Sequence, residues 1–451
     1  MRAERLAPRG CIAVIGAGWA GMAAAVSLAE REIPVTVFEA SRTLGGRARR
    51  VTLDGIDLDN GQHVLLGAYR ETLRLMRKVG ADPERLLLRL PLELRFADGF
   101  HLRAPRLPYP VNLLAAIFGT RSLGLAQSFG AARFVAGLRM KNFRIEPDRS
   151  VARLLDEWNQ AGILRSHLWE PLCVSALNTP VGRASAQVFA NVLRDGLADS
   201  SRSSDLLIGL ADLSRLFPDP AAAYLRTRGG TVCTGSPIKI VTRDSQGFQL
   251  DDRPERYAGV IVACAPQHAS PLLAAFPELA TARALIERLD YEPIVTCYLR
   301  YAGHLSLPSP MLGFAGGILQ WLFDRQRPGS EDHAGLVAAV TSGSGAHEEL
   351  DRETLASRID SELRAALPGL PSLRSSQVIV EKRATFSCRP ALRRPEGATP
   401  VPGLMLAGDY IAGPHPATLE AAVRSGVQAA RCTSDGNLAH VPGEKEKGPS
   451  L

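Results

Sequence analysis

The chain has 451 residues, of which 45% are hydrophobic and 22% charged, and its net charge is +7. This length exceeds what one ordinary core holds, so two domains are expected, and the composition is typical of a soluble globular protein. The sequence has no run of about eighteen apolar residues, which argues against a transmembrane helix. The arginines are spread along the chain and only 6% of residues are aromatic, which argues against nucleic-acid binding.

The N-terminus and the cysteines add two further expectations. The apolar run behind the basic N-terminus is soon broken by glycines, so we expect no signal peptide and a cytoplasmic protein. The seven cysteines lack CxxC and Cys/His metal spacing, so we expect reduced thiols and no metal site.

The first predicted unit covers residues 11–39. A short apolar run, Ile12–Ile15, is followed by glycines, by small helix formers as far as Arg31, and by a β-branched run, Val35–Phe38. This order of strand, glycine-rich turn, helix and strand is typical of a dinucleotide-binding fold. The alternative is a glycine-rich turn in another kind of α/β unit.

Three glycines in this turn have separate roles. Gly16 permits the tight turn, Gly18 lets a pyrophosphate approach the backbone, and Gly21 lets the helix pack closely on the sheet. The N–H groups at the helix start then face the phosphates. Glu39 ends the second strand, where a carboxylate can accept hydrogen bonds from a ribose diol. The sequence therefore predicts a bound dinucleotide.

The following segments extend this predicted site. Residues 40–49 form a loop with paired glycines and three arginines, and an arginine fork can hold a phosphate. Residues 54–63 are dense in turn formers and hydrogen-bonding side chains. A helix is expected over 68–79, and alternating apolar and polar residues predict a hairpin over 92–96 and 100–103.

Residues 107–143 differ from the rest of the chain because they are apolar and aromatic, contain arginines, and include no acidic residue. They are predicted either to be core helices that cover a pocket or to form an amphipathic surface that touches an anionic membrane. We favour the core helices.

The rest of the chain is predicted to alternate between two domains. Helices are expected over 151–217, with a turn at 178–182, then over 221–226 and 348–367. Strands are expected at 231–233, 238–242, 248–250, 257–263, 293–301, 318–323 and 378–384. A discontinuous nucleotide domain is predicted at 11–85, 221–288 and 398–432, a mixed substrate domain at 86–220 and 289–397, and a polar, disordered tail at 433–451.

A second constellation of residues stands near the C-terminus. A buried strand ends on Gly408 and Asp409, and a loop of glycine and proline leads into an alanine-rich helix that begins near Thr418. An acid at the carboxyl end of a strand can hold sugar or ribityl hydroxyls, and a helix start can place its N–H groups against an electron-rich ring. An ordinary strand, loop and helix would not explain this grouping.

The two constellations together resemble a known superfamily. GAGWAG, Glu39, LGGR and LAGDYIAGPHPATLEAAVRSG are similar to motifs of the FAD-dependent amine oxidases and phytoene desaturases. The resemblance implies an α/β fold of the glutathione-reductase type, with a Rossmann FAD-binding domain and a mixed α+β substrate domain. Within the superfamily, DNGQHVLLGAYRETLRLM, LNTPV and EKRATF resemble the hydroxysqualene dehydroxylases of bacterial hopanoid synthesis.

The resemblance also implies which residues hold FAD. The three glycines would hold the pyrophosphate, Glu39 the adenosine ribose, Arg47 the phosphates and flavin, and Asp409 the region between pyrophosphate and ribityl chain. The helix start would face the pyrimidine edge of the flavin, and the backbone of Ile238, in a strand, would meet the adenine. The implied cofactor residues are Gly16, Gly18, Trp19, Ala20, Gly21, Glu39, Ala40, Gly45, Gly46, Arg47, Gly61, Gln62, His63, Ile238, Gly408, Asp409, Thr418 and Leu419.

The implied reaction is hydride transfer from reduced FAD to hydroxysqualene, which gives squalene and water and requires an unidentified reductant for FAD. Hydroxide is a poor leaving group, so a proton donor is needed. The candidates are Asp59, Gln62 and His63, with His63 first because its unperturbed pKa lies near neutral pH. The alternative is that Gln62 and His63 only brace the loop beside the flavin.

Three other functions are alternatives to this reaction. Polyprenyl desaturation uses the same scaffold in the opposite redox direction. Amine oxidation is weakened because the C-terminal loop offers chiefly Tyr410 and His415 in place of an aromatic cage. A prenyl-binding protein without redox chemistry is disfavoured by the intact GAGWAG motif with Glu39 and Asp409.

Overall fold

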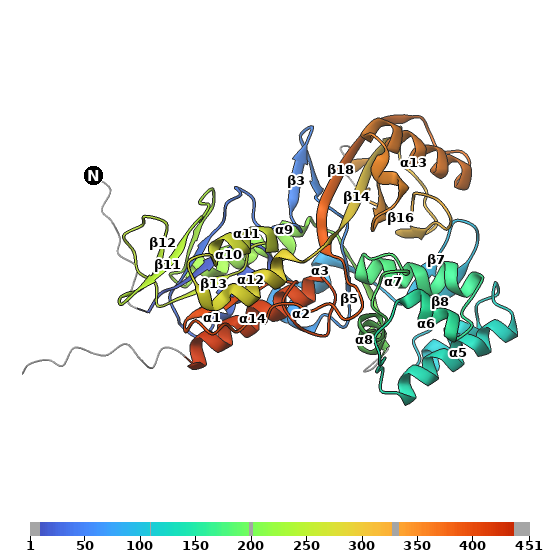
Figure 1. Ribbon diagram of the computed structural model, residues 1–451. Helices are drawn as coiled ribbons and strands as arrows, with labels where there is room; N and C mark the ends of the chain where they lie inside the picture. The colour runs from blue at the N-terminus through green and yellow to red at the C-terminus, as the bar shows by residue number, and fades with distance from the viewer. Residues whose placement is uncertain (1–9, 109, 198–201, 327–332, 437–451) are drawn as a thin grey trace, which may run out of the picture.

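The computed structural model describes residues 10–108, 110–197, 202–326 and 333–436. One half of the molecule is built on a five-stranded parallel sheet (Figure 1). The order of its strands is β10 (Thr231–Cys233), β2 (Val35–Phe38), β1 (Ile12–Ile15), β13 (Gly259–Val262) and β19 (Leu404–Leu406). Strands from both ends and the middle of the chain therefore share one sheet, which confirms the predicted Rossmann-type α/β fold.

Both faces of this sheet are covered, which explains why β1 is apolar at every position. Ile12 and Val14 pack in one cluster with α1 (Trp19–Ala29), α10 (Pro218–Thr227) and α14 (Leu419–Gly436), and Ala13 and Ile15 pack in the cluster on the other face. Helices α1 and α14 lie side by side in Figure 1. A Cβ atom on Gly426 would lie 2.0 Å from the carbonyl oxygen of Ala20, so only glycine allows this contact.

The second sheet is antiparallel and lies at the other end of the molecule (Figure 1). Its order is β15 (Met311–Gly313), β16 (Trp321–Asp324), β17 (Leu336–Ser342), β14 (Tyr291–Tyr301) and β18 (Leu373–Phe386). Alternate residues of β14 point to opposite faces. Cys297 and Leu299 pack in the cluster that contains residues of α13 (Arg352–Ala366), whereas Tyr298 belongs to the large cluster on the other face.

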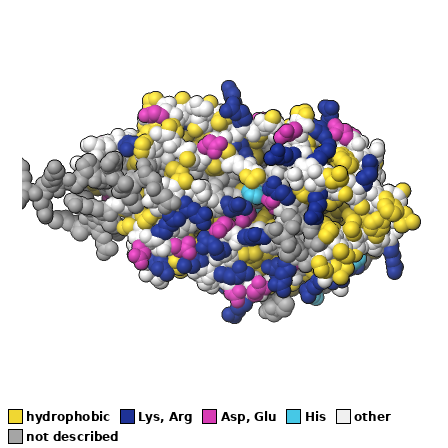
Figure 2. Space-filling model, turned by 90° about the horizontal axis from the view of Figure 1, so that it is seen from below, with side chains coloured by type: hydrophobic (Ala, Val, Ile, Leu, Met, Phe, Trp, Pro, Cys, Tyr) yellow, Lys and Arg dark blue, Asp and Glu magenta, His cyan; other side chains and the backbone are white. Residues whose placement is uncertain are grey.

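A helical layer lies beside this sheet. It contains α4 (Val111–Phe118), α5 (Leu125–Met140), α6 (Val151–Glu157), a π-helical turn (Arg165–Trp169), α7 (Glu170–Leu177) and α8 (Ala186–Leu197). One side of the helices in residues 107–143 packs in the core, where Phe134 and Leu138 are buried. Their outer side is also apolar. Figure 2 shows hydrophobic side chains gathered at the end of the lower face where Figure 1 places α5.

The other elements are smaller. The remaining strands are β3 (Arg50–Leu53), β4 (Ile56–Asp59), β5 (Val64–Leu66), β6 (Leu87–Leu90), β7 (Glu93–Arg95), β8 (His101–Arg103), β9 (Leu206–Gly209), β11 (Val241–Asp244) and β12 (Gly247–Leu250). The remaining α-helices are α2 (Arg70–Lys78), α3 (Pro83–Leu86), α9 (Leu213–Leu216), α11 (Pro266–Leu272) and α12 (Ala280–Glu287). The predicted hairpin is confirmed, because β7 and β8 pair in antiparallel orientation. The division into two domains at the predicted boundaries stays a prediction.

Several strands lie where the sequence did not predict them, and β4 and β9 are two of these. β4 occupies part of the turn-rich stretch 54–63, because Asp54 and Gly55, both at positive φ, make a two-residue hairpin turn between β3 and β4. β9 lies inside the region expected to be helical, and it forms between β5 and β6. Its partners are distant in sequence, so local patterning does not reveal it.

Three further expectations need correction. The strand predicted at 238–242 begins only at Val241, because the Asp251 carboxylate accepts the N–H groups of Lys239 and Ile240. The sequence also did not predict β15 or β17. The polar tail was predicted from residue 433, but α14 continues to Gly436, and residues 437–451 lie outside the described part of the chain.

Candidate active site

The glycine turn between β1 and α1 has no room for side chains at two positions. Gly16 has a φ of +105°, and a Cβ atom there would lie 2.9 Å from the backbone of Ala263. A Cβ atom on Gly21 would lie 1.9 Å from the carbonyl oxygen of Gly16. Gly18 is different, because the nearest atom to its Cβ position is the Cα atom of Gly46, 3.9 Å away. The turn therefore excludes side chains at Gly16 and Gly21, whereas the space beside Gly18 is free of close contacts.

The second glycine loop lies against this turn. The N–H of Gly45 donates to the carbonyl of Ala17 at 2.9 Å, and Gly45 bridges to Gly18 in parallel register. The Trp19 indole is buried and donates to the carbonyl of Ala48 at 3.0 Å. Trp19 and its buried neighbour Ala20 therefore have only backbone atoms to offer a ligand, and the Trp19 side chain joins the two loops.

Glu39 is held beside the glycine turn by two backbone groups. Its carboxylate accepts from the N–H of Ala17 at 2.6 Å and from the N–H of Ser41 at 2.8 Å. The N–H of Ser236 donates to the Glu39 carbonyl at 2.8 Å, so the segment with half-buried Ile238 runs alongside β2. Ala40 is exposed. The structure thus brings together the residues predicted for the adenosine end of the cofactor, but Ile238 is not in a strand.

Arg47 joins the N-terminal loop to the C-terminal motif. Its guanidinium donates to Asp409 Oδ1 and to the carbonyl of Ala384, both at 2.6 Å. Burial alone would lower the pKa of Arg47, but Asp409 and Glu381 raise it above its ordinary value, so the guanidinium stays charged. Gly408 has a φ of +154°. A Cβ atom on Gly408 would lie 2.5 Å from the ring of Tyr410, so there is no room for a side chain.

A buried tyrosine orients Gln62. The Gln62 amide donates to Tyr298 Oη at 2.7 Å, and Tyr298 Oη donates to the carbonyl of Asp59 at 2.8 Å. The N–H of Asp59 donates to the same hydroxyl at 3.1 Å. Burial raises the pKa of Tyr298, so its hydroxyl is neutral. Nothing in the sequence singled out Tyr298, because only the pairing of β14 within its sheet places it under the 59–63 loop.

The three proposed catalytic residues have different surroundings. The Asp59 carboxylate accepts from the N–H of Leu213 at 2.8 Å and pairs with Arg325 at 3.3 Å, and it does not line the large pocket described below. His63 Nδ1 donates to the Gly61 carbonyl at 3.0 Å. Burial lowers the pKa of His63, the Gly61 carbonyl raises it and Arg47 lowers it, so the imidazole is neutral at neutral pH.

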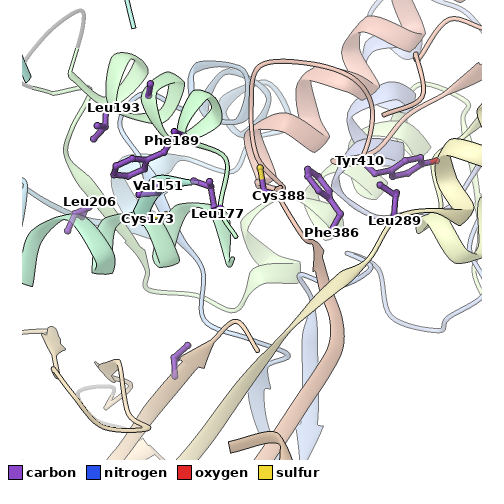
Figure 3. Packing of buried hydrophobic residues seen from close by; sticks show 14 of the residues in the cluster. Val151, Cys173, Leu177, Phe189, Leu193, Leu206, Leu289, Phe386, Cys388 and Tyr410 are labelled. Carbon is purple, nitrogen blue, oxygen red and sulfur yellow. The ribbon is translucent and has the colours of Figure 1, made fainter. Parts of the chain in front are cut away.

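A pocket of about 600 Å³ opens beside Gln62 and Thr418, the residue just before α14. This apolar pocket has the size of small-molecule sites in proteins. Phe189 and Leu193, which lie one turn apart on α8 (Figure 3), are among the residues that line it. The other apolar side chains of its wall come from β7, α7, β9 and the antiparallel sheet, and include Leu94, Leu172, Ala176, Leu206, Met311, Trp321, Phe323 and Val340.

Charged side chains line the same pocket near the C-terminal motif. His415 Nδ1 lies 3.3 Å from Asp195 Oδ2, and Arg194 donates to Asp195 at 2.9 Å. Glu420 accepts from the N–H and hydroxyl of Thr72, and burial raises the pKa of its carboxyl. Glu420 is not among the site residues predicted from the sequence, although its position two residues after Thr418 could have indicated it. Asp195 and Arg194 carried no such signal, since α8 comes from a distant part of the chain.

The geometry agrees with the comparison to known proteins. A model of flavin containing amine oxidoreductases matches residues 19–433. The chain belongs to this family. It is an FAD-dependent oxidoreductase. It is 29% identical to a hydroxysqualene dehydroxylase of Rhodopseudomonas palustris, over 92% of this chain and 96% of the relative, and 26% identical to a zeta-carotene desaturase of Synechocystis, over 93% and 96%.

Solved structures show the same fold. An oxidoreductase from Methanosarcina mazei superposes with a TM-score of 0.71 at 16% identity, covering 93% of this chain and 99% of the other. Cyclohexylamine oxidase from Brevibacterium oxydans gives a TM-score of 0.62 at 18% identity, covering 95% and 99%. At these identities the likeness concerns the fold.

The residues around the glycine turn fit FAD on two observations. The turn and the 45–46 loop leave Gly18 open on the side where a pyrophosphate could approach. In the portions of the chain that the structure describes, the hydroxyls of Thr296 and Tyr410 are buried without hydrogen-bond partners. Thr296 Oγ1 lies 3.8 Å from the Cβ position of Gly61, and the Tyr410 ring adjoins Gly408. Buried hydroxyls usually have partners, so both mark a site for a polar ligand.

Replacing Tyr298 by phenylalanine tests its role beside Gln62. We expect Tyr298→Phe to lower the free energy of unfolding by about 1–3 kcal/mol, because buried groups of Gln62 and Asp59 lose their partner, and to lower kcat. Tyr301→Phe is the matched control, since Tyr301 lies on the same strand and bonds Asp360 at 2.6 Å on the opposite face. Chemical denaturation and turnover measurements on both variants check this. Equal kcat in the two variants would show that Tyr298 has no part in the site.

Proposed function

We propose that this protein reduces hydroxysqualene to squalene. The observation that carries the proposal is the apolar pocket of about 600 Å³, which runs from the wall of α7, α8 and the antiparallel sheet to Gln62 and Thr418. A hydrocarbon chain gains free energy in such a pocket because its surface leaves water. The relative named hydroxysqualene dehydroxylase, 29% identical over nearly the whole chain, supports the same substrate.

The reaction breaks the C–O bond of an allylic alcohol and forms a C–H bond at the same carbon. Reduced FAD supplies the hydride when it is bound, and an electron donor outside the chain restores it. The hydroxyl group leaves as water, so it must receive a proton as its bond breaks. The side chains of this protein orient the alcohol, exclude bulk water and provide the proton.

We propose that Gly16, Gly18 and Gly21 face the pyrophosphate, that Glu39 binds the adenosine ribose, and that Asp409 and Arg47 bind the middle of the cofactor. The helix start at Thr418 and Leu419 faces the flavin ring, together with the 61–63 loop. The N–H groups at a helix start favour negative charge in the ring edge. The hydrogen bond between Arg47 and Asp409 at 2.6 Å supports their shared role.

His63 is proposed as the proton donor, with bracing of the loop as its alternative role. The bond from Nδ1 to the Gly61 carbonyl supports bracing, and the lowered pKa keeps the imidazole neutral at pH 7. The Asp59 carboxylate accepts from the N–H of Leu213 and pairs with Arg325, so both of its oxygens are already engaged, which weakens Asp59 as a donor. Gln62 can position the hydroxyl but has no acidic proton to give.

The pH dependence of turnover separates the two roles of His63. An imidazolium donor with a lowered pKa becomes populated only as the pH falls below about 6.5. We therefore expect turnover of the wild type with reduced FAD to rise as the pH falls through this range, and we expect the rise to be absent in His63→Gln with its flavin retained. Stopped-flow oxidation of the reduced enzyme by substrate measures it. The same pH profile in both proteins would assign His63 to bracing.

Anaerobic incubation of dithionite-reduced protein with hydroxysqualene tests the function itself. The expected product is squalene, identified by gas chromatography and mass spectrometry, with one equivalent of flavin oxidised. Protein with oxidised flavin is the control and should form none. The second candidate is a polyprenyl desaturase, which the relative named zeta-carotene desaturase favours. Conversion of a polyprenyl hydrocarbon with reduction of the flavin, and no squalene, would select it.

We also propose that the protein contacts the inner face of a membrane. Exposed large apolar side chains gather on and beside α4 and α5, and the rings of Phe118 and Phe129 meet there at 5.1 Å. The described residues contain no helix long and apolar enough to cross a bilayer. An apolar patch beside cations and without acids suits the surface of an anionic bilayer. The patch consists of Leu107, Val111, Leu114, Phe118, Leu125, Phe129 and Met140.

A further inference from the structure

We propose that a basic pocket at the C-terminal end of α5 binds the phosphate headgroup of an anionic membrane lipid. This inference rests on the proposed membrane contact and gives it a defined lipid site. The basic pocket has a volume of about 230 Å³ and is separate from the apolar pocket, with which it shares no residue. Lys141, Arg144, Arg149 and Trp158 line it, together with one carboxylate, Glu146.

The charges of the basic pocket favour an anion. The lining holds three cations and one carboxylate, and the carboxylate of Glu157, which pairs with Arg149, reduces the local net charge to about +1. Arg149 pairs with Glu157 at 2.7 Å through Nη2 and donates to the Pro147 carbonyl at 3.1 Å through Nη1, but its Nε is buried and has no hydrogen-bond partner among the described residues. Guanidinium groups bind phosphate oxygens through paired N–H donors. A phosphate would supply the missing acceptor.

The position of the basic pocket selects a lipid phosphate over a soluble one. Lys141 directly follows Met140, which is 87% exposed and ends the apolar outer side of α5. Leu125 and Phe129 lie on that same side of the helix. A lipid carries a phosphate directly next to acyl chains, and α5 carries apolar side chains directly next to cations. The two patterns are complementary.

Trp158 supports the same orientation. Its ring has the guanidinium of Arg133 at 5.5 Å and the ammonium of Lys141 at 6.0 Å, both within the range of cation–π contact. On its inner side Trp158 packs against Gly137 and the buried ring of Phe134, whose centroid lies 5.8 Å from that of Trp158. A tryptophan that is apolar on one side and beside charges on the other is typical of the boundary between headgroups and acyl chains.

Binding of a single lipid molecule is the sharpest test, because a monomeric lipid presents no charged surface. FAD-loaded full-length protein is titrated with dihexanoyl phosphatidylglycerol below its micelle concentration in a calorimeter. We expect one saturable site. Lys141→Ala with Arg144→Ala should weaken it by at least about tenfold, because the lipid phosphate loses two charged donors. Arg106→Ala with Arg121→Ala removes the same charge from exposed positions of the same acid-free region and should change the affinity less than about twofold.

The other outcomes overturn the proposal. Inorganic phosphate binding as tightly as the lipid would mean a soluble-anion site. Equal losses in the two double variants would mean general attraction without a site. Sedimentation with phosphatidylcholine vesicles, with and without phosphatidylglycerol, completes the test. If the wild type does not bind the vesicles, the proposed membrane contact is wrong as well. Squalene formation in detergent depends on neither result, so failure here is distinguishable from failure of the proposed reaction.

Discussion

Asp409→Ala is expected to purify with less than about a tenth of the FAD bound by the wild type. Asp409 lies three residues after the end of β19, is only 7% exposed, and accepts a hydrogen bond from Arg47 at 2.6 Å. Removing one partner of a buried ion pair leaves the other charge uncompensated, which costs about 3–5 kcal/mol. The ion pair joins the loop that contains Arg47 to the C-terminal motif that contains Asp409, and both belong to the proposed cofactor site. Its loss should therefore weaken FAD binding. Flavin absorbance per mole of protein, before and after addition of FAD, measures it.

Two controls separate cofactor binding from folding in that experiment. Asp409→Asn keeps a hydrogen-bond acceptor for Arg47 and should retain more flavin than the alanine variant. Asp244→Ala removes an exposed carboxylate that pairs with Arg256 at 2.9 Å, and it should retain all of it. A fully yellow Asp409→Ala protein would remove Asp409 from the proposed FAD site.

Gly18→Ala and Gly21→Ala are expected to fail in different ways, although the two glycines are three residues apart. At Gly21 a Cβ atom would meet the Gly16 carbonyl at 1.9 Å, so we expect a loss of about 3 kcal/mol in the free energy of unfolding. At Gly18 the nearest atom to a Cβ would be 3.9 Å away, so we expect a loss of about 1 kcal/mol or less, with FAD binding strongly weakened.

Thermal and chemical unfolding, combined with FAD titration of the flavin-free protein, distinguish these outcomes. Gly182→Ala is the control, because no atom lies within 4 Å of the Cβ position of Gly182. Unchanged FAD affinity in Gly18→Ala would mean that the pyrophosphate does not approach this face of the turn. Wild-type stability in Gly21→Ala would mean that α1 can shift away from the strand, which its burial at every position argues against.

The fold was largely predictable because its strongest signals are local. β1, β2 and the hairpin of β7 and β8 lie close to their expected positions, since periodicity and turn residues specify them over a few residues. β9 and β17 were not predicted. Each is a short apolar segment whose strand conformation depends on partners elsewhere in the chain. α14 was expected to end before Thr433, whose polar neighbours resemble a tail, but the Thr433 hydroxyl bonds back to the Ala429 carbonyl.

In the candidate site, too, some residues were predictable from local motifs and others were not. The sequence alone determined the glycine turn, Glu39 and the Gly408-Asp409 motif, because a dinucleotide imposes fixed residue types at fixed spacings on the segments that hold it. The tertiary structure decided that Arg47 pairs with Asp409 across 362 residues, that Tyr298 holds Gln62, and that Asp59 faces Arg325. It also decided that the apolar side of α5 ends at a basic pocket. These contacts join segments that no local pattern relates, so packing of the two sheets and the helical layer had to bring them together.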